Sequence, residues 1–243
     1  MSNYVYLVKG EFQKIGSFKL MLLIIISALA TFGLSLAFIL YKKEYIISEG
    51  LMSMQPIISI TAYFATFVLV IFSSITWYYI ISFENKNGTW SILLTKPISK
   101  KQLLLTKHAL HLVLYIGFNM FYTLASLTLL IILNIELDVS EFLKLQFIFS
   151  LVAITIPYSQ LLFHLMVKNG LIAVSLTILI LFLFLIKDSI PDIIARSIPL
   201  LSVDNVWMNI ANTGVITLYC MGSVLYGLII LLISIKNNYY TYE

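Results

Sequence analysis

Residues 20–41 read LMLLIIISALATFGLSLAFILY, and no side chain in this stretch is charged. A hydrocarbon layer about 30 Å thick is crossed by about 20 residues of helix, each rising about 1.5 Å. A helix also satisfies its own backbone N–H and C=O groups, which lipid cannot do. Residues 20–41 therefore predict a membrane-spanning helix.

Five more runs without Asp, Glu, Lys or Arg follow: residues 50–83, 108–135, 145–167, 169–186 and 205–235. The chain is 60% hydrophobic and 11% charged, with mean hydropathy +1.00, whereas a soluble domain has about 25% charged residues. We therefore expect an all-α, polytopic membrane protein with six transmembrane helices. Residues 1–243 are expected to form one transmembrane domain.

The basic residues are unevenly shared between the two sets of helix ends. The N-terminus, the 84–107 loop, Lys168 and the C-terminus together carry ten of the 15 lysines and arginines. The positive-inside rule then predicts that both termini of this multi-pass membrane protein are cytoplasmic. Anionic lipid accounts for the net charge of +4, so we expect no nucleic-acid partner.

Residues 1–19 precede the first span and have an amphipathic pattern. Four apolar side chains can share one helix face: Val5, Val8, Phe12 and Ile15. Lys9, Glu11 and Lys14 would lie elsewhere on that helix. The pattern is typical of a cytoplasmic interfacial helix, and the alternative is a frayed terminus.

Two further segments have a recognisable membrane pattern. Residues 187–212 are too polar to span the membrane and too apolar for a free loop, which predicts a broken, re-entrant outer segment between helices 5 and 6. Near the end of the second run, Trp77, Tyr78 and Tyr79 are expected at the membrane interface, where aromatic residues gather.

Sequence motifs for catalysis are missing. The chain has no phosphate-binding G-x-x-x-x-G-K-[ST], no zinc-binding H-E-x-x-H and no G-x-S-x-G. Ion-coupled transporters usually need ionisable residues at membrane depth, and the six apolar runs hold no Asp, Glu, Lys or Arg. We expect no enzyme activity and no cofactor in this chain, so any energy source would lie in another chain.

Three histidines lie in the apolar runs. His108 and His111 are three residues apart near the start of the third run, and His164 stands alone in the fourth. One interpretation is an intramembrane metal or haem site. The favoured interpretation is neutral imidazoles bonded to water or a partner helix, because no second ligand pair lies at a matching depth, and we therefore expect no metal site.

The third run also carries a polar stripe. Six side chains fall within about 80° of arc on a helix: His108, His111, Tyr115, Asn119, Tyr122 and Ser126. Such a stripe faces protein or a water-filled cavity. Helix packing and a substrate pathway both remain open, and both predict that this helix is central to the bundle.

The loop after the second run predicts a docking element. A short helix capped by Asn87 or Thr89 would end at Pro97. Three side chains would project from one side: Trp90, Leu93 and Leu94. An exposed apolar knob usually docks on a partner, and the alternative is a helix lying flat in the lipid interface with Trp90 as its anchor.

A new helix is expected directly after this loop. Ser99 and Gln102 form an S-x-x-Q capping box, which satisfies two backbone N–H groups at a helix start. The helix should begin there and run into the third span.

This loop resembles the first cytoplasmic loop of ABC-2-type transporter permeases. The matching residues are Glu84, Gly88, Thr89, Leu93, Leu94, Pro97, Ile98, Ser99, Lys100 and Lys107. Thr106 departs from the pattern, because the family often has Gly before the last Lys. The architecture also resembles the family over the whole chain.

The resemblance implies a coupling helix that sits in a cleft of a separate ABC ATPase subunit, which would bind ATP and Mg. The implied coupling residues are Glu84, Gly88, Thr89, Trp90, Leu93, Leu94, Pro97 and Lys100. It also implies a second permease copy or a sister permease in a dimer, and outer helices in 187–212 that help to close the exit.

In size and composition the chain is similar to bacterial permeases that export amphipathic peptide toxins or confer self-immunity to antimicrobial peptides. An amphipathic peptide is therefore the expected substrate. This resemblance implies a location in a bacterial cytoplasmic membrane. Three alternatives stay open. The chain could be an ABC permease for an antibiotic or a lipid, a His-ligated metal or haem protein, or a membrane scaffold that transports nothing.

Overall fold

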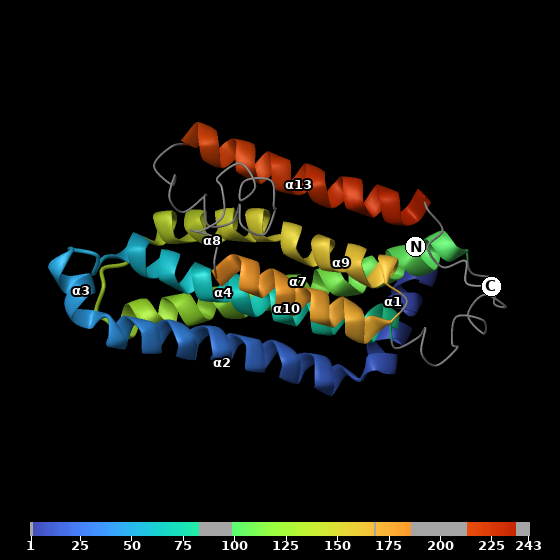
Figure 1. The fold of residues 1–243 in the computed structure, drawn as a ribbon, viewed down its shortest axis with the longest axis horizontal. Helices are drawn as coiled ribbons and strands as arrows, with labels where there is room; N and C mark the ends of the chain where they lie inside the picture. The colour runs from blue at the N-terminus through green and yellow to red at the C-terminus, as the bar shows by residue number, and fades with distance from the viewer. Residues whose placement is uncertain (1, 83–98, 168, 186–212, 237–243) are drawn as a thin grey trace.

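The computed structural model describes residues 2–82, 99–167, 169–185 and 213–236 (Figure 1). All regular structure in these ranges is helical. Most of the coupling loop and the whole of the expected re-entrant segment, residues 187–212, lie outside the described residues.

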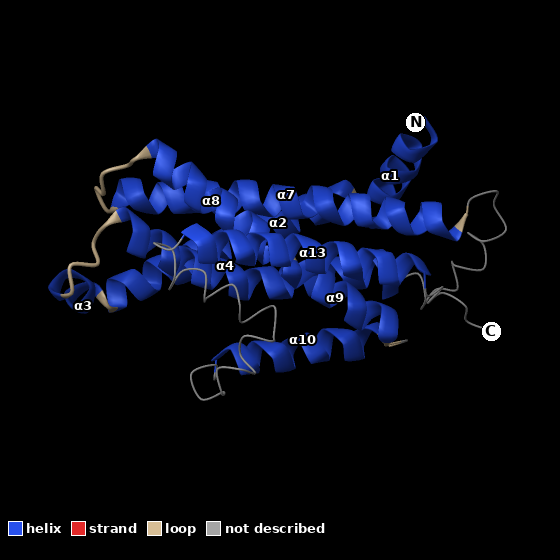
Figure 2. Cartoon of the chain, turned by 90° about the horizontal axis from the view of Figure 1, so that it is seen from above, coloured by secondary structure: helices blue, strands red, loops and turns tan. Residues whose placement is uncertain are grey.

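The helices follow one another as α1 (Ser2–Ile15), α2 (Ser17–Tyr41), α3 (Lys43–Ser48), α4 (Met54–Trp77), the π-helical turn η1 (Tyr78–Ser82), α7 (Lys100–Ile132), α8 (Val139–Ala153), α9 (Thr155–Met166), α10 (Gly170–Leu185) and α13 (Thr213–Lys236). The long helices run side by side along the molecule, and α8 and α9 follow each other along one line (Figures 1 and 2).

Five described stretches are long and apolar enough to cross a membrane: Phe18–Tyr41, Met54–Ile81, Lys101–Ile132, Val139–Met166 and Thr213–Lys236. This confirms the prediction of an all-helical, multi-pass membrane protein. The expected fifth span coincides with α10, whose 16 residues are about 24 Å long. The six-span count therefore stays a prediction.

Residues 1–19 contain the expected helix, and a glycine separates it from the first span. Gly16 has φ 89°, in the left-handed half of conformational space that glycine enters at little cost. The chain turns there, so α1 and α2 are two helices joined at one residue.

The expected fourth span is broken near its middle. Ile154 lies between α8 and α9 and belongs to neither helix. Pro157 explains the break, because it has no N–H to donate to the carbonyl of Ala153 and its ring crowds that carbonyl. The pattern of charges gave no sign of this break, since α8 and α9 are both apolar.

Trp77 was expected at the membrane interface; its side chain packs inside the bundle, and its depth in the membrane stays a prediction. Its side chain is only 1% exposed, and its indole N–H donates a 2.8 Å hydrogen bond to the carbonyl of Pro157. A buried indole needs such a partner. Trp77 therefore ties the end of α4 to α9, whereas Tyr79 in η1 is 38% exposed.

The core has two parts along the bundle. A smaller cluster joins the ends of α2 and α7 to α3 and to the starts of α4 and α8, and includes Ile39, Ile46 and Leu130. The larger cluster centres on α4, α7 and α9, and includes Phe72 and Phe118. Apolar side chains on α2 and α13 remain largely exposed, as expected for helices that face lipid.

Candidate functional site at the start of α7

Helix α7 is longer than a membrane requires. Its 33 residues correspond to about 50 Å, against about 30 Å of hydrocarbon. Lys100, Lys101 and Lys107 all lie in its first turns, and the uncharged part follows them. The first turns of α7 are therefore the part that extends beyond the hydrocarbon.

The start of α7 has the predicted capping box. Ser99 is the N-cap: its Oγ accepts a 3.2 Å hydrogen bond from the Gln102 N–H. In return, the Gln102 Oε1 accepts a 3.0 Å bond from the Ser99 N–H. This part of the sequence-based prediction is confirmed. The box fixes the residue at which the chain re-enters helix after the coupling loop.

Of the expected coupling residues, only Lys100 is described, and it is the first residue of α7. The others lie outside the described residues: Glu84, Gly88, Thr89, Trp90, Leu93, Leu94 and Pro97.

A buried ion pair lies two turns into α7. The Lys107 ammonium is 3.2 Å from the Glu11 carboxylate of α1, and both side chains are buried. The same ammonium donates a 2.8 Å hydrogen bond to the carbonyl of Ile80 in η1. Burying a charge is costly unless it is paired and hydrogen-bonded, and Lys107 meets both conditions. We call Lys107, Glu11 and Ile80 the Lys107 joint.

Glu11 was expected away from the apolar face of its helix, and the structure shows that it is nevertheless buried. The helical pattern separated Glu11 from Phe12, yet Phe12 packs against the larger core cluster while Glu11 faces α7. The buried face of α1 is therefore wider than its apolar stripe, because Lys107 supplies a partner for the carboxylate.

A group of stacked rings lies one turn further along α7. The His111 ring stacks on Trp77, with centroids 4.3 Å apart and planes 11° from parallel. The His111 Nε2 is 3.1 Å from the Thr76 hydroxyl of α4. The His108 Nε2 is 3.4 Å from the Ser234 hydroxyl of α13. Each imidazole is thus engaged by a hydroxyl from another helix.

These histidine contacts are typical of helix packing, as in the favoured interpretation of the sequence. His108 also stacks on Tyr158 of α9, with ring centroids 5.9 Å apart. In the described part of the chain, no three His, Cys, Asp or Glu side chains lie close enough together to hold a metal ion.

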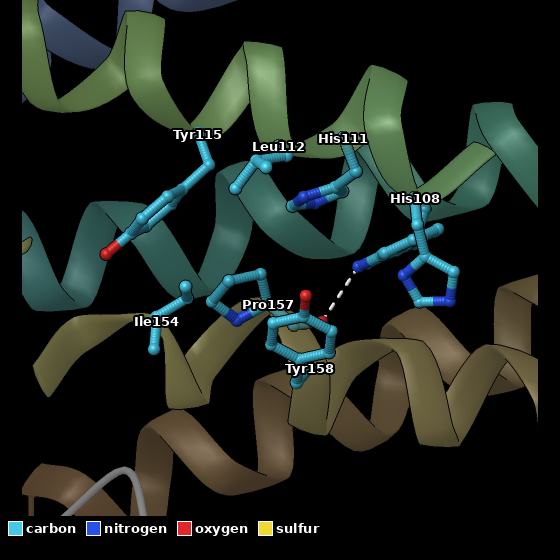
Figure 3. A pocket seen from close by; sticks show the side chains of 8 residues that line it. His108, His111, Leu112, Tyr115, Ile154, Pro157 and Tyr158 are labelled. Atoms are coloured by element: carbon cyan, nitrogen blue, oxygen red, sulfur yellow. Dashed lines mark hydrogen bonds between the residues drawn. The ribbon is translucent and has the colours of Figure 1, made fainter. Parts of the chain in front are cut away.

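A small pocket opens where α4, α7 and α9 meet (Figure 3). Its lining consists of Trp77, His108, His111, Leu112, Tyr115, Ile154, Pro157 and Tyr158. Leu112, at its rim, is 43% exposed. The space inside this open pocket suits about one water molecule.

The polar stripe of the third span lies inside the bundle. All six side chains are buried: His108, His111, Tyr115, Asn119, Tyr122 and Ser126. The Tyr115 hydroxyl donates a 2.5 Å hydrogen bond to the carbonyl of Ser150 in α8. The Ser150 hydroxyl is in turn 3.0 Å from the Asn119 side-chain oxygen. These contacts favour helix packing, and a pathway role stays a prediction.

The central position of α7 was predicted and is confirmed. It packs against α1, α2 and α4, and its stripe contacts α8 and α13.

Sequence reasoning missed a second buried polar contact. The Thr177 hydroxyl of α10 lies 2.6 Å from the Gln160 side-chain oxygen of α9 and 2.9 Å from the Ser74 hydroxyl of α4. All three side chains are buried. Gln160 was the available signal, because an amide in an apolar run needs a partner on a neighbouring helix.

Comparison with known proteins agrees with this arrangement. A family model described as ABC-2 family transporter protein matches residues 7–187. No curated protein and no solved structure matches the chain. The matched residues run from α1 to the end of α10 and include the capping box and the Lys107 joint. The match covers most of the 243 residues, and the chain therefore belongs to the ABC-2 family of transporter proteins.

Proposed function

We propose that this chain is the permease subunit of an ABC exporter and that a separate ATPase subunit drives it. The observation that carries the proposal is the family match together with the coupling-loop pattern of residues 84–107. In such an arrangement Trp90, Leu93 and Leu94 form the knob that enters the ATPase cleft. ATP and Mg bind to the partner, and this chain forms the pathway.

The described residues on either side of the loop support a role in coupling. The chain leaves η1 and re-enters helix at Ser99. The Ile80 carbonyl and the Lys107 ammonium join these two sides directly. A direct bond between η1 and α7 fixes these two elements relative to each other, which supports a role in transmitting movement from an ATPase.

The proposed topology has six spans, with α10 as the fifth and both termini in the cytoplasm of a bacterium. Two copies, or this chain and a sister permease, form the dimer. The lysine distribution supports the orientation.

The proposed substrate is an amphipathic or antimicrobial peptide, moved for toxin export or for self-immunity. Its support is the compact chain with apolar and aromatic spans, which suit a partly apolar cargo, and this rests on analogy at the level of the fold. An antibiotic or a lipid is the competing cargo.

The first experiment is affinity purification of the tagged protein from its native membrane in mild detergent, followed by mass spectrometry. We expect a stoichiometric ABC ATPase that is lost with Trp90→Asp and kept with Trp90→Phe, because only the first places a charge in an apolar cleft. If the purified protein retains its lipids but no ATPase copurifies with it, the permease proposal is overturned and a membrane scaffold that transports nothing is favoured.

The substrate is tested next, in proteoliposomes that contain the purified complex. ATP hydrolysis is measured with a cationic amphipathic peptide, with a scrambled peptide of equal composition and with lipid alone. Stimulation by the amphipathic peptide only is the expected result. Equal rates with all three would contradict the peptide assignment and leave the permease role intact.

A further inference from the structure

The Lys107 joint connects three elements that are far apart in sequence. Lys107 contributes one ammonium from α7, Glu11 a carboxylate from α1 and Ile80 a backbone carbonyl from η1. Residues 83–98 lie between η1 and α7, so two of the three elements are the two ends of that loop. The third is the N-terminal helix.

The Lys107 joint also bears on the direction of α1 relative to the rest of the bundle. Gly16, with its positive φ, interrupts the helix between α1 and α2, so α1 does not simply continue the first span. Helix α1 contacts α2, α7 and η1, and the Glu11–Lys107 pair is a directional contact between α1 and α7.

Stability alone gives no reason for an ion pair here. A buried ion pair is often no more stabilising than well-packed apolar side chains of similar volume, because desolvation opposes the attraction. Its distinctive property is geometry: an ammonium with two oxygen partners within 3.2 Å admits few relative positions of the helices that carry them.

We propose that Lys107 is a positioning residue that fastens α1 to η1 and to α7, the two helical elements between which residues 83–98 lie, so that α1, η1 and the start of α7 move as one body. This rests on the proposed function in one respect, namely that the loop docks on an ATPase. The N-terminal helix then follows each movement of η1 and of the start of α7.

The first test needs no ATPase. Spin labels are placed at the exposed positions Lys9 in α1 and Lys101 in α7, as Lys9→Cys and Lys101→Cys in a Cys220→Ser background. Pulsed electron paramagnetic resonance of the full chain in nanodiscs then gives the distance distribution between α1 and α7. A narrow distribution is expected in the parent protein.

The test variant is Glu11→Gln with Lys107→Met, which leaves no unpaired buried charge and so avoids the main cause of misfolding. We expect a clearly broader distance distribution. The matched control is Lys43→Met with Glu44→Gln, an exposed pair in α3, which should leave the distribution narrow. An unchanged distribution in the test variant would overturn the proposal.

The second test uses the complex with its ATPase. Energetic coupling between sites commonly changes binding by about fivefold or more, and we expect the peptide transported per ATP hydrolysed to fall by about this factor in the same double variant. The proposal would also be overturned if the distance distribution broadens but the peptide transported per ATP stays normal. In that case the position of α1 would have no effect on transport. If no ATPase is found, the proposed function fails, and the resonance test still decides whether the joint exists.

Discussion

The imidazole of His111 lies flat on the indole of Trp77, and the indole N–H reaches the carbonyl of Pro157. One side chain from α4 thereby holds α7 on one side and α9 on the other, next to the break at Ile154. The start of α7 is thus braced by this stack and by the Lys107 joint one turn before it.

Removal of the indole N–H should loosen this brace. Trp77→Phe keeps a ring against His111 but loses the bond to the Pro157 carbonyl, and loss of a buried hydrogen bond costs about 1–3 kcal/mol. We expect a lower midpoint of thermal unfolding in detergent. Tyr45→Phe, at an exposed ring in α3, is the control and should leave the midpoint unchanged. An equal effect of both substitutions would contradict the assignment.

The capping box at the start of α7 should have a measurable local effect. Ser99→Ala removes the oxygen that caps Gln102, at a cost of about 1 kcal/mol. Hydrogen exchange in the first turn of α7 should become faster. Ser53→Ala is a matched control, because Ser53 is the N-cap of α4 and makes no side-chain cap hydrogen bond. Protection in the first turn of α7 that survives Ser99→Ala would show that the cap is dispensable.

Close packing of α13 on α9 depends on one glycine. A Cβ at Gly227 would lie 3.0 Å from the Tyr158 ring, whereas a Cβ at Gly222 would meet nothing within 4 Å. We expect Gly227→Val to lower the free energy of unfolding by about 1–3 kcal/mol, as overpacking does. Gly222→Val is the control, because it makes the same substitution where no clash is expected. Similar destabilisation by both variants would argue against the contact between Gly227 and Tyr158.

The hydroxyl of Thr177 should hold α10 in place. Thr177→Val keeps the shape but leaves the buried oxygens of Gln160 and Ser74 without this contact, at a cost of about 1–3 kcal/mol. Faster protease cleavage at the 167–170 turn is the expected readout. Thr217→Val, at an exposed threonine of α13, should be silent. If the Thr177→Val variant resists the protease as well as the parent protein does, Thr177 does not anchor α10.

The coupling loop gives a functional prediction. Either Glu84→Ala or Gly88→Trp should uncouple ATP hydrolysis from transport, while the amount of protein in the membrane stays unchanged. Immunoblots of membranes and export assays measure the two quantities separately. Full export by both variants would contradict the proposed coupling role.

Local patterns predicted local structure well. The membrane runs follow from uncharged length alone, and the capping box follows from Ser99 and Gln102, three residues apart. Each signal is complete within one helix or one turn, so no tertiary contact is needed to interpret it.

Contacts between distant residues were beyond a single sequence. Glu11 and Lys107 are 96 positions apart, and nothing near either residue indicates the other. The sequence placed Trp77 at the membrane interface because aromatic residues gather there. Its hydrogen-bond partner, the carbonyl of Pro157, is 80 residues away in the chain, so the sequence did not indicate that the ring is buried. The break at Ile154 is different, because Pro157 is a local signal that could have predicted it.

The length of α7 has a mechanical consequence. One continuous helix passes from inside the membrane to the root of the 83–98 loop, so any change of tilt within the bilayer reappears as sideways displacement at the protruding end. For a rod of about 50 Å pivoting at its middle, a 10° change moves that end by about 4 Å. In the proposed complex, closure of the ATPase by a few ångströms would be enough to re-orient the lipid-embedded half of α7 without any bend or unwinding of the helix.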